Sequence, residues 1–536
     1  MADIEKKALD SPIEQPLSDV EAGSSEDAAG ELAPIHIPGI DSVFEEQAAL
    51  VNHAVQVIGM GKYQWALFIL AGYGWMVDQL WQTTISDALA QVAVEFQPQH
   101  SAFLSLALIA GLVCGAGFWG LGADLIGRRL AFNTTLFIAA VFGIAAGAAP
   151  NFVACAVMSA FVGFGVGGNL PVDSAIFLEF LPATHQYLLV ILSVWWALGQ
   201  IIPAGAAWGF LPNFSCASDV APGHCLKQDN MGWRYLLYTM GGFTFLLWIV
   251  RFFFFHLHES PKYLIGQGRY QEAIDVLDAV AKYNGVKQPL TVARLEQVER
   301  EHIERHGAHH AVDRIVDRKA AFKRAVSAFK PKDFSHIRAL FATPKLAYSF
   351  VLILLIWGMI GLGSPLYSNF LPEYLAAHGA KAGDDSINVT YRNNFIIIVC
   401  SLPGTLLGGW LIGLRYIGRR GTLGGSLIIS GIFLYAFTTA RTPGANLAFN
   451  CVATFVQYIM WGALYCYTPE VIPSVHRGTG TGLASAFNRI CGLMAPIIAT
   501  YVGYSDSPIF VAASLYVVAG LLSFCLPFET MGKASL

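Results

Sequence analysis

Two ionisable residues lie deep inside long apolar stretches, where a charged side chain is costly and therefore points to function. Asp78 lies about two-thirds along the apolar run 64–87, and Arg489 lies nine residues into the run 480–502. Burial disfavours the charged form of a carboxylate, whereas a nearby cation favours it. We therefore expect Asp78 to exchange a proton. We expect Arg489 to pair with a carboxylate such as Asp78 or to bind an anionic solute through its planar guanidinium. A fixed structural ion pair is the alternative for both.

Asp173 is a second candidate for proton exchange. It lies near the end of the apolar run 152–176. That position favours a structural or gating role over proton exchange.

Other polar and aromatic side chains recur within the apolar runs and could line a binding cavity. A pocket for a small organic molecule combines apolar walls with a few placed polar groups. For the aromatic members, packing or anchoring at a membrane interface is an equally good interpretation. The candidates for solute binding are Asn169, Gln200, Tyr367, Asn369, Gln457, Trp461 and Tyr465, with Trp81, Gln82 and Trp196 as further candidates.

Membrane helices are the elements that must position these residues. Hydrophobic residues make up 55% of the 536-residue chain and charged residues only 13%, which excludes a disordered protein and a nucleic-acid binder. A membrane-spanning helix needs about 20 mostly apolar residues, and long runs without alternation predict helices. Twelve runs qualify, near 64–87, 102–123, 130–149, 152–176, 188–211, 233–256, 346–370, 393–413, 421–440, 445–468, 480–502 and 507–527.

Two short motifs recur at one spacing and indicate an internal duplication. Ile126-Gly127-Arg128-Arg129 recurs as Ile417-Gly418-Arg419-Arg420, 291 residues later. Glu179-Phe180-Leu181-Pro182 corresponds at the same spacing to Glu470-Val471-Ile472-Pro473. Parallel repeats of this kind enclose a central cavity and alternate its access between the two sides of the membrane. The predicted fold is therefore an all-α membrane protein of twelve transmembrane helices in two six-helix halves.

Five segments make up the predicted organisation. An acidic and mostly disordered tail (1–57) precedes a six-helix bundle (58–256), a polar central loop with short helices (257–343), a second bundle (344–528) and a short tail (529–536). Most of the 33 Lys and Arg residues fall on the cytoplasmic side if both termini lie there, as the positive-inside rule requires.

This topology places some polar features outside the membrane and leaves others without a role. Cys216 and Cys225 share one outer loop, on the oxidising side, and a disulfide between them is plausible. Glycosylation sequons begin at Asn213 and Asn388 in outer loops. The glycine-rich stretch 163–168 lies within a predicted span, which favours close helix packing over nucleotide binding. We predict no metal site and no cofactor.

Several motifs resemble those of known transporters. Residues 120–129 resemble the loop between the second and third spans of the major facilitator superfamily, with Leu125 at a normally basic position. His258-Glu259-Ser260-Pro261-Lys262 and the set Pro469, Glu470, Pro473, Arg477 and Gly478 resemble the sugar-porter relatives. The segments 61–65, 72–78, 167–173 and 477–482 look most like the synaptic-vesicle-protein-related (SVOP-like) branch.

The resemblance implies a cytoplasmic gate of paired charges that latches the two halves together. Arg pairs well with carboxylate through its planar fork. Topology charge alone is an alternative for the arginines, but it does not account for the repeated glutamates. The implied gate residues are Asp124, Arg128, Arg129, Glu179, Arg419, Arg420, Glu470 and Arg477. Asp78 matches the carboxylate that proton-coupled sugar porters carry on their first span.

Together these features predict a secondary active transporter and no enzyme. We expect proton-coupled symport of a small organic anion, with the solute, protons and the lipid bilayer as partners. The chain would act as a monomer in the plasma membrane with both termini cytoplasmic. A sugar or polyol facilitator or proton symporter is the alternative within the class, and a non-transporting receptor on the same fold is the alternative outside it.

Overall fold

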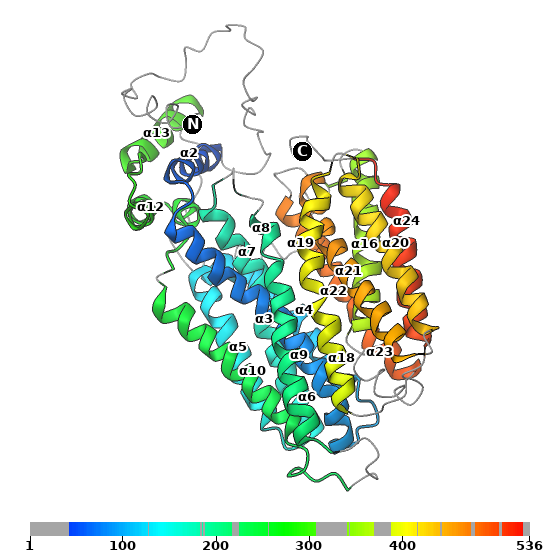
Figure 1. Ribbon diagram of the computed structural model, residues 1–536. Helices are drawn as coiled ribbons and strands as arrows, with labels where there is room; N and C mark the ends of the chain where they lie inside the picture. The colour runs from blue at the N-terminus through cyan, green and yellow to red at the C-terminus, as the bar shows by residue number, and fades with distance from the viewer. Residues whose placement is uncertain are drawn as a thin grey trace. The chain divides into compact units, whose positions relative to one another are not determined.

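The structure is a computed structural model in which residues 43–536 form one compact unit. The described residues are 42–126, 128–182, 185, 188–216, 224–255, 257–306, 340–341, 344–368, 387–414, 416–439, 442–472, 477–502 and 506–528. Within these ranges the regular elements are all helices, mostly α-helices (Figure 1). The predicted all-helical membrane fold is confirmed.

The first half of the bundle contains the helices of the first six predicted spans. They are α3 (Lys62–Phe96), α4 (Phe103–Ile126), α5 (Arg128–Gly147), α6 (Phe152–Gly167) continued by α7 (Asn169–Phe180), α9 (Val194–Phe214) and α10 (Gly232–Ile249). The short α8 (Leu188–Ile191) precedes α9, and a π-helical turn, η3 (Val250–Phe254), ends α10. Asn151 caps α6 by accepting a hydrogen bond from the main-chain N–H of Ala154, which satisfies one otherwise unpaired donor.

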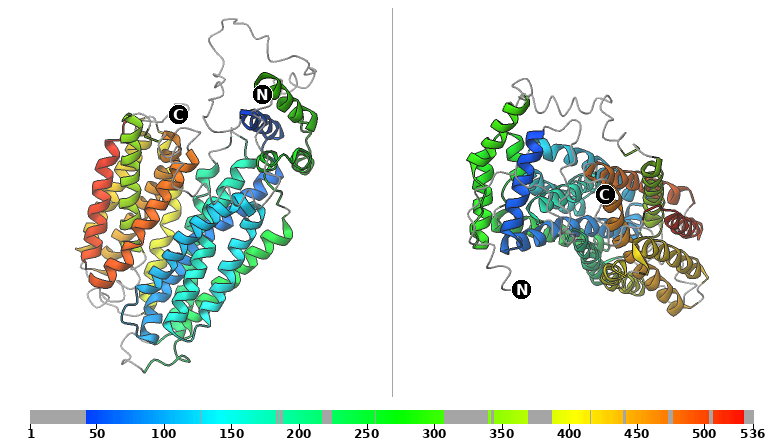
Figure 2. Two further views of the ribbon diagram at one scale, coloured as in Figure 1. Left: turned by 180° about the vertical axis from the view of Figure 1, so that it is seen from behind. Right: turned by 90° about the horizontal axis from the view of Figure 1, so that it is seen from above.

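The second half repeats this arrangement. Its helices are α16 (Pro344–Ser368), α18 (Ile387–Val399) continued by α19 (Ser401–Ile412), α20 (Gly418–Thr438), α21 (Pro443–Val471), α22 (Arg477–Gly492) continued by α23 (Met494–Val502) and α24 (Ser507–Phe524). The blue-to-green and the yellow-to-red helices stand beside each other in both views of Figure 2. The two halves meet where α18 packs on α9 and where α22 and α23 pack on α4.

Ten helical stretches in the described part of the chain are long and apolar enough to cross a membrane. The remaining two predicted spans correspond to α3 and α4. The long α3 carries Lys62, Asp78, Asp87 and Glu95 and is therefore less apolar, and the apolar part of α4 is confined to Phe103–Trp119. The polar residues of α3 therefore need an explanation from the place of this helix in the fold.

Small residues allow the closest helix contacts. A Cβ atom on Gly115 of α4 would lie 2.2 Å from the main-chain oxygen of Phe164, and one on Gly163 of α6 would lie 2.2 Å from that of Leu108. Neither position can hold a larger side chain without separating the helices. The glycine-rich stretch within the fourth predicted span therefore serves helix packing.

Four helices outside the bundle gather at one end of it, which we call the α2 end. They are α2 (Ser42–Ile58), α11 (Pro261–Gly266), α12 (Tyr270–Asn284) and α13 (Val292–His306), and α2, α12 and α13 lie together at the top of Figure 1. The buried amide of Gln47 on α2 donates to the Tyr270 hydroxyl at 2.9 Å and to the main-chain oxygen of Leu295 at 3.0 Å. Buried polar groups must be paired, so these bonds fix how the three helices meet.

The helices at the α2 end are also bonded to the start of α3. Asn284 at the end of α12 accepts a hydrogen bond from the main-chain N–H of Tyr63 at 3.0 Å and donates to the side-chain oxygen of Gln64 at 2.8 Å. The opposite end of the bundle, which we call the disulfide end, carries the Cys216–Cys225 disulfide after α9.

Candidate functional site

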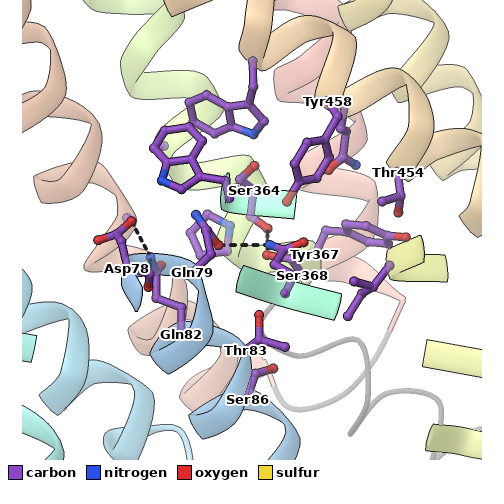
Figure 3. Close-up of a pocket in the computed structure, with 18 of the residues that line it drawn as sticks. Asp78, Gln79, Gln82, Thr83, Ser86, Ser364, Tyr367, Ser368, Thr454 and Tyr458 are labelled. Carbon is purple, nitrogen blue, oxygen red and sulfur yellow. Dashed lines mark hydrogen bonds between the residues drawn. The ribbon is translucent and has the colours of Figure 1, made fainter. Parts of the chain in front are cut away.

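A cavity lies between the two halves of the bundle. Its walls come from α3 and α9 of the first half and from α16, α18, α21 and α22 of the second, with a few residues of α4 and α7. Figure 3 shows polar side chains from several of these helices pointing toward one another. Of the sequence candidates, the lining includes Asp78, Gln82, Trp196, Gln200, Tyr367, Gln457, Trp461, Tyr465 and Arg489.

Two of the candidates for solute binding lie outside the cavity lining, and a third lies outside the described residues. Asn169 is fully buried within the first half, where its amide donates to the main-chain oxygen of Gly74 at 3.5 Å. Trp81 is also fully buried and packs against Gly143 of α5. The sequence could not separate these faces because most of α3 is buried, so apolar residues surround it on nearly every side. Asn369 falls outside the residues that the structure describes.

Asp78 and Arg489 meet across the cavity, as one of the two sequence interpretations requires. The Arg489 Nη2 lies 3.9 Å from Asp78 Oδ1, and the two side chains are 14% and 5% exposed. This separation exceeds a hydrogen bond, so the contact is a loose ion pair at the cavity wall. Gln82 donates to the other carboxylate oxygen of Asp78 at 3.3 Å.

Arg489 extends from the second half of the bundle into the first. Besides Asp78 on α3, its Nη1 donates to the main-chain oxygens of Leu112 on α4 and Gly167 on α6, at 3.4 and 3.3 Å. These bonds compensate part of the cost of placing a guanidinium among apolar helices. Any movement of one half against the other must rearrange them.

An aromatic cluster borders the cavity on the side of the α2 end. Trp196 of the first half packs on Tyr465 of the second with ring centroids 5.0 Å apart, and Tyr465 also packs on Trp357 at 4.9 Å. Trp75 lies 5.0 Å from Trp196, and Trp461 extends the cluster. Edge-to-face and tilted contacts of this kind add to the apolar burial that holds the two halves together here.

Three hydrogen bonds join the halves on the side of the disulfide end. The Asn394 amide donates to Asp87 Oδ1 at 2.8 Å, and the Tyr391 hydroxyl donates to the main-chain oxygen of Asp87 at 2.8 Å. The Trp208 indole N–H donates to the side-chain oxygen of Asn388 at 2.9 Å. The cavity therefore lies between an aromatic contact and a polar contact of the two halves.

The cavity also contains polar residues that sequence reasoning missed. Gln79 accepts a hydrogen bond from the Gln200 amide at 2.9 Å. The others are Thr83, Ser86, Asp87, Ser364, Ser368, Asn394, Thr454, Tyr458, Ser485 and Asn488. Spacing could have found part of the set, because Gln82 and Ser86 follow Asp78, and Thr83 follows Gln79, at intervals of four residues.

Asp173 lies outside the cavity lining. Its carboxylate accepts a hydrogen bond from Arg251 of η3 at 2.5 Å, and both side chains are fully buried. The guanidinium also lies on the ring of Phe132, and Gly74 leaves room for the second carboxylate oxygen. The arrangement is that of a buried ion pair inside the first half, which is the structural alternative considered from the sequence.

Among the predicted gate residues, the ion pair that the structure describes lies within one half of the bundle. Arg419 of α20 donates to both oxygens of Glu470 on α21, at 3.1 and 3.2 Å, and Arg420 donates to the main-chain oxygen of Phe524. Arg129 on α5 is exposed and Glu179 on α7 is half-buried. The side chains of Asp124, Arg128 and Arg477 are outside the described part, so a latch between the halves stays a prediction.

Comparisons with known proteins agree with this architecture. The chain matches the sugar (and other) transporter family over residues 53–534. It is 48% identical to siderochrome iron transporter 1 of Ceriporiopsis subvermispora, over 93% of each chain. It is 28% identical to the niacin transporter NiaP of Acinetobacter baylyi, over 89% of this chain and 97% of that one. It is 26% identical to the synaptic vesicle 2-related protein of rat, over 90% and 82%.

A solved structure shows the same fold. The xylose transporter XylE of E. coli, in a partially occluded inward-open conformation, superposes with a TM-score of 0.64 at 14% identity, over 87% of this chain and all of that one. The chain belongs to the sugar (and other) transporter family of the major facilitator superfamily, and it is a membrane transporter rather than an enzyme. The likeness to the synaptic-vesicle branch is distant compared with that to the fungal transporter.

Proposed function

We propose that this transporter carries a small organic carboxylate together with a proton, by alternating access. The observation that carries the proposal is the loose Asp78–Arg489 pair in the wall of the cavity between the two halves. A pair that must separate and re-form in each cycle suits a partly open site better than a fully buried one.

Charge balance in the cavity couples the two ions. Arg489 is paired with Asp78, so a solute carboxylate that approaches it would place two negative charges around one cation. A proton on Asp78 removes that conflict, because Arg489 can then pair with the solute instead. The solute anion and the proton enter together, and the charge of the site stays unchanged.

The cavity walls fit a carboxylate that carries an apolar ring or chain. Trp196, Trp461 and Tyr465 supply aromatic surface close to Arg489, and Gln79 and Gln200 supply amides. Arg is suited to a planar carboxylate because it can donate two parallel hydrogen bonds. Niacin, the solute named for the Acinetobacter relative, is a small ring carboxylate of this kind.

The positive-inside rule orients the molecule. The Arg–Arg motifs at positions 128–129 and 419–420 lie at the α2 end, so this end faces the cytoplasm. The disulfide end, which carries the Cys216–Cys225 disulfide and the sequon residues Asn213 and Asn388, then faces outward. In the plasma membrane, protons would enter the cavity from that side. The transporter would function as a monomer.

A ferric siderochrome is the second candidate solute, because the 48%-identical fungal relative is named for that cargo. A neutral sugar or polyol is a third candidate. It is less well supported, because a neutral solute would not need the cation that Arg489 places in the cavity wall. A non-transporting receptor is less well supported, because it has no need of a charge pair that can separate.

An uptake screen in proteoliposomes tests the proposal. Purified full-length protein is assayed with niacin, a ferric hydroxamate siderophore and a hexose, with and without an inward proton gradient. We expect gradient-driven accumulation of the carboxylate, with uptake strongly reduced in Arg489→Ala and partly retained in Arg489→Lys. The matched control is Arg392→Ala, at an exposed cation of α18 outside the cavity lining.

Two outcomes would contradict the proposal. Accumulation of the siderophore or hexose alone would assign the other solute. An unchanged apparent affinity for niacin in both Arg489 variants would show that the guanidinium does not bind the solute.

A further inference from the structure

A buried carboxyl group closes the cavity toward the disulfide end. Asp87 lies on α3, only 1% exposed, and accepts the Asn394 amide on one carboxyl oxygen. The Tyr391 hydroxyl donates to its main-chain oxygen. Asp87 belongs to the first half of the bundle, and both partners belong to α18 of the second. This is therefore a direct polar contact between the two parts that must separate when the cavity opens on this side.

The second carboxyl oxygen of Asp87 is buried without a hydrogen-bond partner. One helical turn further along α3, the side-chain oxygen of Gln91 is also buried without a partner. Residues four apart lie on the same helix face. Two neighbouring buried acceptors are unfavourable as they stand, and a proton on the carboxyl group would turn one of them into a donor.

The cations on the surrounding helices are engaged elsewhere. Helix α9 has no acidic or basic residue along its length. Arg234 of α10 pairs with Glu95 at 2.6 Å, and Arg489 of α22 lies beside Asp78. Arg392 of α18 is exposed and donates to the side chain of its neighbour Asn393. Among the described residues, Tyr367 and Tyr458 bring further ionisable hydroxyls to the cavity lining, and the Tyr391 hydroxyl is bonded to the main chain of Asp87.

An ionised carboxylate in this position would be a buried charge without a countercharge among the described residues. The effective cost of such a charge is several kcal/mol, whereas a protonated carboxyl group carries no charge. The closed contact between Asp87 and Asn394 therefore fits the protonated acid. When α3 and α18 separate, water reaches Asp87 and the charged form is no longer penalised.

We propose that Asp87 is a gating proton site: it binds a proton from the disulfide side when the cavity closes toward the disulfide end and releases that proton to the same side when the cavity reopens. Asn394 is the partner on the second half that donates to Asp87 in this closed contact. The inference goes beyond the proposed function, because it requires neither the proton on Asp78 nor a carboxylate solute.

The sign of the pH effect follows from which state binds the proton. The closed state holds it and the open state does not, so acid favours closure at the disulfide end and alkali favours opening. The closed state binds one proton more than the open state. The ratio of closed to open molecules therefore changes about tenfold per pH unit, in the pH range between the pKa of Asp87 in the open state and that in the closed state.

Spin-label distances test this without any solute. The chain is prepared with its free cysteines replaced and with Val153→Cys on α6 and Phe510→Cys on α24, which are 69% and 43% exposed and lie in different halves at the disulfide end. The interlabel distance is measured in lipid nanodiscs from mildly acidic to mildly alkaline pH. We expect a short distance in acid and a growing long-distance population in alkali.

Three variants separate the proposal from other sources of pH dependence. Asp87→Asn mimics the protonated acid and should keep the short distance at every pH. Asp78→Asn should retain the pH response of the parent, because the response belongs to Asp87. This expectation holds whether or not the proposed symport is correct. Asn394→Asp places two carboxyl groups face to face, and it should enlarge the long-distance population in alkali.

Each variant must elute as a single folded species before its distances are compared. A parent distance that does not change with pH would overturn the proposal. So would an Asp87→Asn variant that responds to pH as the parent does.

Discussion

Replacing Asp78 by Asn isolates the charge that the proposed symport depends on. Asn keeps the size of the side chain and can still accept the hydrogen bond from Gln82, but it removes the negative charge 3.9 Å from Arg489. At this distance and an effective dielectric constant of 20, the lost attraction is about 4 kcal/mol. That attraction is what a solute carboxylate must overcome when Asp78 is ionised.

The expected result concerns affinity and coupling separately. In the parent, affinity for the carboxylate should fall as Asp78 loses its proton, since Arg489 is then occupied. In Asp78→Asn, affinity at alkaline pH should rise by at most about a thousandfold, because each 1.4 kcal/mol is a factor of ten. The affinity should no longer vary with pH in that range.

The assay compares two modes of transport in the same proteoliposomes. Exchange of labelled for unlabelled niacin needs no net proton movement, so Asp78→Asn should retain it. Accumulation driven by an inward proton gradient should be abolished. Glu272→Gln, at an exposed residue of α12, is the control that should change neither.

Two results would refute this reasoning. If Asp78→Asn still accumulates solute when the proton gradient is applied, another group carries the proton. If its affinity for niacin keeps the pH dependence of the parent, Asp78 and the solute do not compete for Arg489.

Three further substitutions, two of them with a matched control variant, test the scaffold around the site. Asp173→Asn leaves Arg251 buried without its carboxylate and should cost about 3–5 kcal/mol of stability, seen as a lower thermal midpoint. Glu272→Gln, in an exposed pair, should cost less than about 1 kcal/mol in the same assay. Gly115→Val forces α4 away from α6, so the yield of monodisperse protein should fall sharply, whereas Gly242→Val, at an open position, should leave it unchanged. Cys216→Ala opens a short covalent loop and should cost about 2–3 kcal/mol, and reductant should then have no further effect on the thermal midpoint.

The sequence was sufficient for the fold class and for recognising the two ionisable residues at the centre of the candidate site. Long apolar runs dictate membrane helices because the bilayer offers no hydrogen-bond partners to an open backbone. Asp78 and Arg489 could be recognised singly, because a charge in such a run is expensive wherever its partner lies. Their interaction could be suggested but not established, since they are far apart along the chain.

Residues that are ordinary in isolation could not be found in this way. Asn394 and Tyr391 are unremarkable polar side chains at the start of an apolar helix, and their contact with Asp87 joins positions separated by 307 and 304 residues. Asn169 and Trp81 looked like cavity residues but face the interior of the first half. Asp173 was a candidate for either proton exchange or a structural role, and the spacing of residues could not reveal that Arg251 lies beside it.

Local sequence thus determined which segments enter the membrane and which of their charges demand an explanation, because burial energy depends on the residue itself. Only the tertiary structure decided which of those charges share a cavity, which are locked in a buried pair and which close the contact between the halves. Those outcomes depend on the direction in which each helix face points and on what the opposite half places against it. The spacing of residues along one helix determines neither the direction of its faces nor the residues that lie opposite them.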